Sequence, residues 1–566
     1  MHIKELEVRN FRGLDVEIKS VEKISMIIGK NDSGKTNLCQ AILKVLDYKK
    51  RKNPFLISDS TNSNGKEIKI RIVLDAENLN DEQLGTVGNL IYKNIDEKKE
   101  ITAQLTSIYN DEIGEYEDQL IYGDPKGDFI QQRNGVQTSL DKILSIIYIS
   151  PTYDIHDSEN NYFSFVEKTN KENGILFSDE IAECLEVLKD IIQSDSIITS
   201  IQNDINSNDG FNELFEQYKF KVVPKIKQDN LYKSLDVVPY KEKADILYIG
   251  DAKNKLLSTI FKSKIYDENK EKIYLVEEPE NHLYVLLQRM YIKALMSLNP
   301  EQIIFTTHSP FTIDFEKVKQ IIKITDCNKI NSFNNKSTDD FRKYGYLINV
   351  QIAEMIYYDV VLLVEGASEK YFYSYLMSND DSFLKAINDR RMGICEIDGI
   401  AFKNTKELLE KLGIKVYIKT DNDIYLNPKK TERRYAGILR CISYLAEDDK
   451  IKFYESIGVE ENDFSFSPSD EMKDKIECKM EDICSFFYSK GIFLSKHHNG
   501  FEGDFLEFLS LNENDFDYNE LLDYLKMAKL KNLHSFISEE KFKLKITDKS
   551  KNSILVRFLY EWLFEV

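Results

Sequence analysis

"GKNDSGKT", residues 29–36, is the stretch that predicts the fold of the N-terminal half of the chain. Its spacing is G-x-x-x-x-G-K-[ST], and it connects an apolar segment, ISMIIG, to an amphipathic one, TNLCQAILKVLDY. A strand, a glycine-rich loop and a helix in this order direct backbone N–H groups and a helix N-terminus toward a phosphate. The flanks therefore favour a nucleotide-binding loop over a chance glycine turn.

The loop also contains the side chains that such a site needs. Lys35 is expected to reach the β- and γ-phosphates of ATP, and Thr36 is expected to bind the accompanying Mg²⁺. Successive backbone N–H groups of the loop are expected to surround the phosphates. The residues predicted to contact the nucleotide in this loop are Gly29, Asn31, Ser33, Gly34, Lys35, Thr36 and Asn37.

Two later strands end in residues that complete an ATP site. KIYLVEEPENHL, residues 272–283, is an apolar run that ends in Glu277 and Glu278. We expect Glu277 to hold Mg²⁺ through water and Glu278 to polarise the attacking water. In QIIFTTHSP, residues 302–310, the apolar strand is followed by His308, which is expected to contact the γ-phosphate. Solvated acids or a structural histidine would explain each motif alone, but their order along the chain favours one site.

Length and composition limit the class of protein. The chain has 566 residues, too many for one hydrophobic core, so several domains are expected. It has 42% hydrophobic and 30% charged residues and no apolar run of about 18 residues, which predicts a cytoplasmic protein without a membrane span. Its seven cysteines form no CxxC pair, which favours reduced thiols. A formal charge of −20 argues against a general nucleic-acid coat but not against a local basic channel.

A second α/β series begins at VVLLVEGASEKYFYSYL, residues 360–376. Glu365 ends its strand and Glu369 falls in the first turn of its helix, while GIKVYIKTDND delivers Asp421 and Asp423 from a later strand. Ligands of α/β proteins gather at such strand ends. Converging carboxylates repel one another unless a hard cation such as Mg²⁺ or Mn²⁺ lies between them. A helix-terminal charge and an ordinary Asx turn are the alternatives for each motif alone.

The first three motifs, with NFRG near the N-terminus, resemble the ABC-type ATPase head of the SMC, RecF and Rad50 group. This resemblance implies a long insertion between the two halves of the head. It also implies head-to-head pairing, with ATP between one phosphate loop and the signature motif of the other head. The candidate signature, YIGDAKNKLLS at 248–258, keeps Gly250 but has Ala252 and no Ser-Gly pair. Fast hydrolysis is therefore not expected, and nucleotide sensing is favoured.

The E-G-x-x-E and D-x-D motifs resemble a Toprim domain. An ABC head followed by a Toprim domain resembles the OLD (overcoming lysogenization defect) family of nucleases, and within it the nuclease subunits of Gabija anti-phage systems. The resemblance implies a further acidic motif, for which FEGDFLEFL supplies Glu502 and Asp504. It also implies a late catalytic lysine, for which Lys529 is the best match and Lys526 and Lys531 are alternatives.

The predicted fold class is α/β: an ABC-type ATPase head with a helical insertion, followed by a Toprim α/β domain. Residues 155–235 have apolar positions at three- and four-residue spacing, which predicts helices and a dimerisation surface. The predicted parts are the N-terminal part of the head at 1–154, the helical insertion at 155–240, the C-terminal part of the head at 241–348 and the Toprim nuclease domain at 349–566.

The expected function is metal-dependent nicking of double-stranded DNA in anti-phage defence, with ATP and Mg²⁺ in the head gating the nuclease. We expect one or two Mg²⁺ or Mn²⁺ ions, because paired metals are the usual device for phosphodiester cleavage. Lys529 is expected to neutralise charge on the phosphate. The first metal is assigned to Glu365, Asp421 and Asp423, and the second to Glu369, Glu502 and Asp504.

Partners follow from local charge and from the resemblance. Basic clusters at 48–54, 427–435 and 521–551 are candidates for a DNA channel, or are simply a solvated lysine-rich surface. The resemblance implies a homotetramer built as a dimer of dimers, a UvrD-like helicase partner and inhibition of nicking by nucleotide. The alternatives are a stand-alone or retron-linked OLD nuclease, a topoisomerase-like strand transferase, and an SMC- or RecF-like ATPase whose C-terminal domain only binds DNA or protein.

Overall fold

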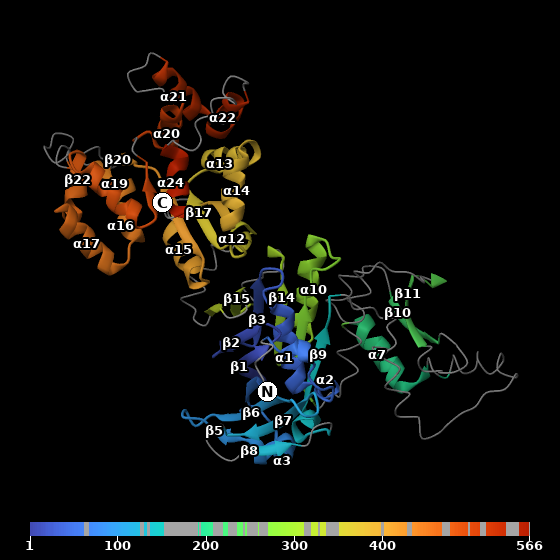
Figure 1. Cartoon of the computed structure of the whole chain (residues 1–566). Helices are drawn as coiled ribbons and strands as arrows, with labels where there is room; N and C mark the ends of the chain where they lie inside the picture. The colour runs from blue at the N-terminus through green and yellow to red at the C-terminus, as the bar shows by residue number, and fades with distance from the viewer. Residues whose placement is uncertain are drawn as a thin grey trace. The chain divides into compact units, whose positions relative to one another are not determined.

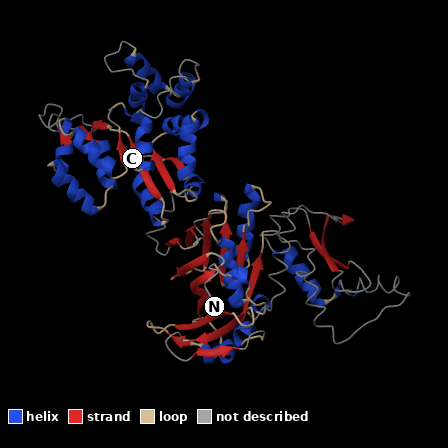
Figure 2. Cartoon of the chain, in the orientation of Figure 1, coloured by secondary structure: helices blue, strands red, loops and turns tan. Residues whose placement is uncertain are grey.

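The chain folds into two compact units, Met1–Lys336 and Ser337–Val566, each described here by itself (Figures 1 and 2). The computed structural model describes residues 1–61, 67–124, 129–132, 136–151, 191, 194–207, 219–224, 235–241, 244–245, 259, 270–310, 318–326, 329–334, 350–397, 401–426, 433–466, 476–495, 498–509, 517–538 and 554–564. The predicted domain limits stay predictions, since the boundary at 348 lies outside these ranges.

The first unit contains an antiparallel sheet in the order β2-β1-β4-β6-β7-β8, with β5 paired to β6. Apolar side chains alternate along its strands, as expected of a sheet with one covered face: Ile68, Ile70 and Ile72 of β4 are buried. Its strands are β1 (His2–Phe11), β2 (Leu14–Ile18), β4 (Glu67–Asp75), β5 (Tyr92–Lys93), β6 (Lys99–Asn110), β7 (Glu115–Gly123) and β8 (Phe129–Gln132).

A second sheet of this unit has the order β16-β15-β3-β14-β13-β9 and is parallel except for β16. Its inner strands are almost wholly buried, because parallel sheets are covered on both faces. Its strands are β3 (Ile24–Gly29), β9 (Leu144–Ile149), β13 (Glu271–Glu277), β14 (Gln302–Thr307), β15 (Gln320–Asp326) and β16 (Lys329–Asn334).

Helix α1 (Lys35–Leu46) contacts strands of both sheets and joins them into one core (Figure 1). Leu38, Ile42 and Val45 lie at helical spacing and are fully buried, which explains why this amphipathic segment lies where it does. The other α-helices in the described part of the head are α2 (Tyr48–Arg51), α3 (Asp81–Val87), α4 (Ser139–Ile143) and α10 (Val285–Ser297).

The segment predicted as a helical insertion is only partly helical in the described residues. It contains α7 (Ser196–Ser207), but also β10 (Lys219–Pro224) and β11 (Leu235–Lys241), which pair with each other. Strand β11 also pairs with β12 (Ala244–Asp245). The run KFKVVP of β10 alternates polar and apolar residues, a pattern typical of a strand. Residues 152–190, and the predicted signature motif at 248–258, lie outside the described residues.

The second unit is built on a parallel sheet in the order β18-β17-β19-β23. It also contains a small antiparallel sheet in the order β20-β21-β22. Its strands are β17 (Val360–Val364), β18 (Met392–Glu396), β19 (Lys415–Thr420), β20 (Ile424–Leu426), β21 (Arg433–Tyr435), β22 (Ser465–Phe466) and β23 (Ile492–Leu494). The α-helices among its described residues are α12 (Val350–Met355), α13 (Ala367–Asn379), α14 (Asp381–Arg390), α15 (Phe402–Lys411), α16 (Ala436–Tyr444), α17 (Glu447–Ile457), α19 (Met480–Ser489), α20 (Gly500–Phe508), α21 (Tyr518–Met527), α22 (Lys529–Ile537) and α24 (Ile554–Phe564).

An aromatic cluster fixes the two helices that carry acidic side chains in this unit. Phe372 of α13 packs edge-on against Phe505 and Phe508 of α20, with ring centroids 5.7 and 5.5 Å apart. All three rings are buried, and such contacts add to the hydrophobic stabilisation of the core. Helices α13 and α20 are thereby held in one packed arrangement.

The described residues contain five free thiols and no helix that could cross a membrane. Cys39, Cys395, Cys441, Cys478 and Cys484 are free thiols, in line with the prediction of reduced cysteines. Among the described helices, none combines the length and the hydropathy that a membrane crossing requires.

Candidate nucleotide and metal sites

The phosphate loop lies at the carboxyl end of β3 and leads directly into α1. Lys35 is the first residue of the helix, and its Nζ donates to the carbonyl oxygens of Gly29 at 3.1 Å and Lys30 at 2.6 Å. Burial lowers the pKa of Lys35 to about 8. The hydroxyl of Ser33 is buried and has no hydrogen-bond partner in the described part of the structure. A buried cation and an unsatisfied hydroxyl in one loop fit a bound phosphate chain.

The acidic strand and the histidine strand lie beside the loop. Strand β14 lies between β3 and β13. His308, just after β14, and Glu277, the last residue of β13, therefore lie at the sheet edge where the loop begins. Glu277 is buried, one of its oxygens has no hydrogen-bond partner among the described residues, and burial raises its pKa. His308 Nε2 lies 3.5 Å from Glu278 Oε1. The three predicted motifs therefore meet at one sheet edge.

Two residues of this site were not predicted from the sequence. Tyr148 of β9 donates its hydroxyl to Glu277 Oε2 at 3.0 Å, and Glu280 accepts the backbone N–H of His308 at 2.5 Å. Both bonds join segments far apart in the chain, so no local pattern announces them. Asn37, in contrast, donates its amide to the carbonyl of Arg12 at 2.8 Å rather than to the loop.

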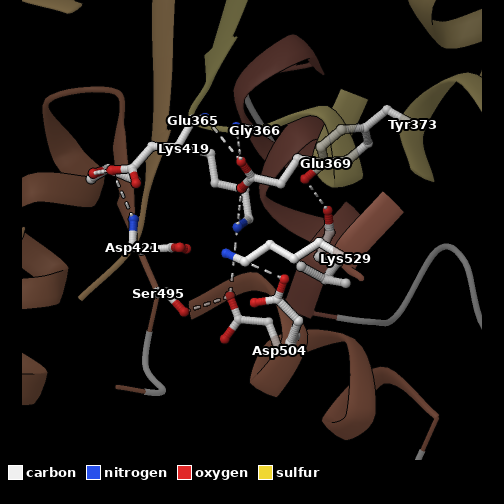
Figure 3. Close-up of polar contacts among 12 residues, drawn as sticks. Glu365, Gly366, Glu369, Tyr373, Lys419, Asp421, Ser495, Asp504 and Lys529 are labelled. Carbon is white, nitrogen blue, oxygen red and sulfur yellow. Dashed lines mark hydrogen bonds and ion pairs between the residues drawn. The ribbon is translucent and has the colours of Figure 1, made fainter. Parts of the chain in front are cut away.

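The acidic motifs of the second unit meet at the carboxyl ends of its parallel strands (Figure 3). Glu365 follows β17, and Asp421 and Asp423 follow β19. Thr420 donates its hydroxyl to the Glu365 carboxylate, which also accepts the Asp421 N–H at 3.3 Å. Burial raises the pKa of Glu365. The predicted convergence of these three acids is what the parallel topology produces.

An arginine that the sequence did not single out joins these acids. Arg440 of α16 lies 3.1 Å from Glu365 Oε1 and 3.0 Å from Asp423 Oδ2, and it donates to the carbonyl of Asp421 at 3.1 Å. Its guanidinium group offsets the mutual repulsion of the carboxylates. The side chain is 28% exposed, so solvent reaches this contact.

Two glycines, at the starts of helices α16 and α20, lie against the D-x-D turn. A Cβ atom on Gly437 would overlap the Asp421 carbonyl, and one on Gly500 would overlap the Asp421 carboxylate. Asp421 Oδ1 is buried without a hydrogen-bond partner among the described residues. Together with Glu365 and Asp423 it offers carboxylate oxygens, the type of ligand that Mg²⁺ and Mn²⁺ prefer.

Replacing Gly500 by alanine is expected to weaken Mn²⁺ binding about 10-fold, as for other changes just outside a metal's own ligands. The added methyl group displaces the Asp421 carboxylate. The backbone is also strained, because alanine disfavours the φ of +62° at this position. Mn²⁺ titration followed by electron paramagnetic resonance measures this effect. Gly458→Ala is the matched control, because its φ is +65° but the nearest atom is a lysine Nζ at 3.4 Å. Equal loss in both variants would assign the effect to backbone strain alone.

The remaining predicted ligands have other partners. Glu369 Oε2 accepts the N–H groups of Glu365 at 2.9 Å and Gly366 at 3.1 Å, and its Oε1 accepts from Lys419 at 2.6 Å (Figure 3). Asp504 accepts the hydroxyl of Ser495 at 2.7 Å. In the described ranges no three Asp, Glu, His or Cys side chains form a ready-made metal cage.

Of the three candidate lysines, the structure brings Lys529 nearest to the acids. Lys529 Nζ lies 3.6 Å from Glu502 Oε1, while Lys526 donates to Asn499 at 2.8 Å. The Lys529 side chain is 62% exposed and Glu502 is buried, so the lysine extends from solvent toward the site. Its assignment as the late catalytic lysine stays a prediction.

Comparison with known proteins adds to this geometry. A family model described as an AAA ATPase domain matches residues 1–313, more than half of the chain. The chain belongs to the AAA ATPase domain family. A second model matches residues 356–423 of this AAA ATPase and is described as the TOPRIM domain of overcoming-lysogenization-defect-like proteins. The predicted fold class, an ATPase head followed by a Toprim domain, is confirmed.

A curated relative spans most of this AAA ATPase. Endonuclease GajA of Bacillus cereus (strain VD045) is 26% identical over 474 residues, which cover 79% of this chain and 80% of the relative. With the two domain matches, this similarity confirms the predicted resemblance to OLD-family nucleases of the Gabija type.

Solved structures also resemble parts of this AAA ATPase. An Smc head bound to the C-terminal winged-helix domain of ScpA matches with a TM-score of 0.38 and 16% identity, covering 59% of this chain and 98% of that one. The recombination mediator RecF with ATP matches with a TM-score of 0.36 and 12% identity, covering 59% and 99%.

Proposed function

We propose that this protein is a divalent-metal-dependent endonuclease that nicks double-stranded DNA at the Toprim site, under the control of ATP bound to the head. One observation carries the proposal. Glu365, Asp421 and Asp423 follow adjacent parallel strands, and an oxygen of Asp421 is buried there without a hydrogen-bond partner among the described residues. The name of the relative GajA, an endonuclease, supports the same activity for this chain.

The acidic and basic side chains of the Toprim site have different proposed roles in cleavage. Glu365, Asp421 and Asp423 would hold Mg²⁺ or Mn²⁺. A divalent cation held there supplies an activated water and offsets charge on the phosphate. Arg440 holds Glu365 and Asp423 in position, and Lys529 offers a further positive charge to the scissile phosphate.

The head would act as a nucleotide sensor. Lys35, Ser33 and Thr36 would hold ATP with Mg²⁺, and Glu277 and His308 would respond to its γ-phosphate. Following the Gabija nucleases that the chain resembles, we propose that ATP inhibits nicking and that the protein acts in anti-phage defence. A homotetramer and a UvrD-like helicase partner belong to the same proposal.

Nicking of supercoiled plasmid by the full chain tests this function. We expect conversion to open circles with Mg²⁺ or Mn²⁺, no conversion with EDTA, and slower conversion when ATP is added. Equal rates with and without ATP would contradict the sensor role. A covalent protein–DNA adduct would instead indicate a strand transferase with a tyrosine nucleophile, and the absence of any cleavage would favour a head that only loads DNA or protein.

A further inference from the structure

A buried lysine lies at the centre of the acidic cluster. Lys419 is in β19, two residues before Asp421, and its Nζ lies 2.6 Å from Glu369 Oε1 and 3.7 Å from Asp504 Oδ2. The exposed fractions of the three side chains are 0%, 3% and 0%. Figure 3 shows the Lys419 chain extended between the two carboxylates. It thus connects acids from α13 and α20 to the strand that carries the D-x-D motif.

The surroundings of Lys419 favour its charged form. The carboxylate oxygens of Glu369 at 2.6 Å and Asp504 at 3.7 Å face the ammonium group from two helices, and all three side chains are buried. The ring of Phe501 lies 5.4 Å from the ammonium group and adds a weaker attraction. A cation paired in this way inside a protein is costly to remove, because its partners would be left as uncompensated buried charges.

The bonds of Glu369 point to a role in holding Glu365. Its Oε2 accepts two backbone N–H groups at the turn after β17, which include that of Glu365 itself. Its Oε1 is engaged by Lys419. Three of the roughly four acceptor positions of Glu369 are therefore occupied. A metal ion at the remaining position on Oε1 would lie beside the Lys419 ammonium group, whose charge repels it.

We propose that Lys419 is a fixed cation that replaces a second metal ion, so that the Toprim site takes a single exchangeable divalent cation. This inference rests on the proposed function and narrows it. The exchangeable ion is held by Glu365, Asp421 and Asp423. Lys419, Glu369 and Asp504 form a permanent ion cluster that positions Glu365, and Lys419 acts as a positioning residue without contact to DNA.

Counting bound Mn²⁺ on the full chain without nucleotide or DNA tests the inference. Electron paramagnetic resonance of free Mn²⁺ gives the number of ions bound, and each variant is compared with the wild type. Asp421→Asn is expected to lose one ion, and Asp504→Asn is expected to lose none. Loss of one ion in each of these variants, with two lost in the double variant, would overturn the proposal by showing two metal sites.

Removing the lysine charge gives a second, independent measurement. Lys419→Met keeps the length of the side chain but leaves Glu369 and Asp504 without a cation, so it is expected to bind one Mn²⁺ more than the wild type. Lys419→Arg, which restores the charge, is expected to return the count to the wild-type value. An unchanged count in a folded Lys419→Met variant would contradict the proposal, and if this variant does not fold the aspartate variants decide.

A matched control and the nuclease assay distinguish a failure of the single-ion proposal from a failure of the proposed nuclease function. Lys490→Met removes a lysine that pairs with Asp449 at 2.7 Å before β23, at the opposite end of the sheet strands, and should leave the Mn²⁺ count unchanged. The Mn²⁺ dependence of nicking is expected to have a Hill coefficient near 1 for the wild type. One bound ion without nicking would refute the proposed nuclease but leave the single-ion site standing, and two ions with nicking would do the reverse.

Discussion

Replacing Glu365 by glutamine is expected to lower plasmid nicking at least about 100-fold, because it removes a charged ligand from the proposed metal site. Glutamine has nearly the same shape, and its amide oxygen can still accept from the Thr420 hydroxyl and the Asp421 N–H. The change therefore removes charge without opening a cavity. The attraction of Arg440 for this position is weakened as well, since its partner becomes neutral.

Three measurements make the Glu365→Gln result interpretable. Initial nicking rates with saturating Mg²⁺ give the effect, thermal unfolding checks the fold, and ATP titration checks the head. Glu410→Gln is a suitable control, because Glu410 is a half-exposed acid of the same unit whose partner, Lys406, lies one helical turn away. Wild-type nicking by Glu365→Gln would place the active site elsewhere in the chain.

The second large effect is expected at the other site. Lys35→Ala should weaken ATP binding at least about 100-fold, since hydrogen bonds to charged groups contribute about 1.5–3 kcal/mol each and Lys35 is expected to make more than one. The lysine is buried against the loop, and burial lowers its pKa to about 8. The negative charge of bound phosphates stabilises the ammonium form, so ATP and the protonated lysine favour each other.

Calorimetric titration with ATP and Mg²⁺ measures the loss of affinity. Lys49→Ala, at an exposed lysine of α2 just beyond the phosphate-loop helix, provides the control for a loss of surface charge. In the nicking assay the Lys35→Ala variant should no longer respond to ATP. If it binds ATP as tightly as the wild type, the loop does not bind the phosphates; if it binds none yet its nicking still falls when ATP is added, the control lies outside the head.

Local sequence patterns predicted both sheet edges because each motif follows an apolar strand. Glu277 and Asp421, each just after or at the end of a buried run, lie where that rule places them. The partners that hold them were not predictable. Tyr148 and Arg440 reach their acids from segments 129 and 17 residues away, and neither has a local pattern that differs from an ordinary strand or helix residue.

One expectation differed from the structure for an identifiable reason, and one predicted ligand has partners that the sequence did not indicate. The whole insertion was expected to be helical, but it contains β10 and β11. The prediction extended the helical spacing of its first part over a short run that alternates polar and apolar residues. Glu369 was assigned to a metal from the motif alone. The capping geometry of α13 and the inward direction of Lys419 give it other partners, and both depend on tertiary packing.

The hydroxyl of Tyr148 has a mechanical consequence. Its strand, β9, lies at one edge of the sheet and is the last described strand before the predicted insertion, which begins at residue 155. A shift of β9 by one residue along its axis would break the hydrogen bond from Tyr148 to Glu277. It would also change the register of the pairing between β9 and β13. A displacement of β9 would therefore remove a hydrogen bond from the Glu277 carboxylate, which lies beside the phosphate loop.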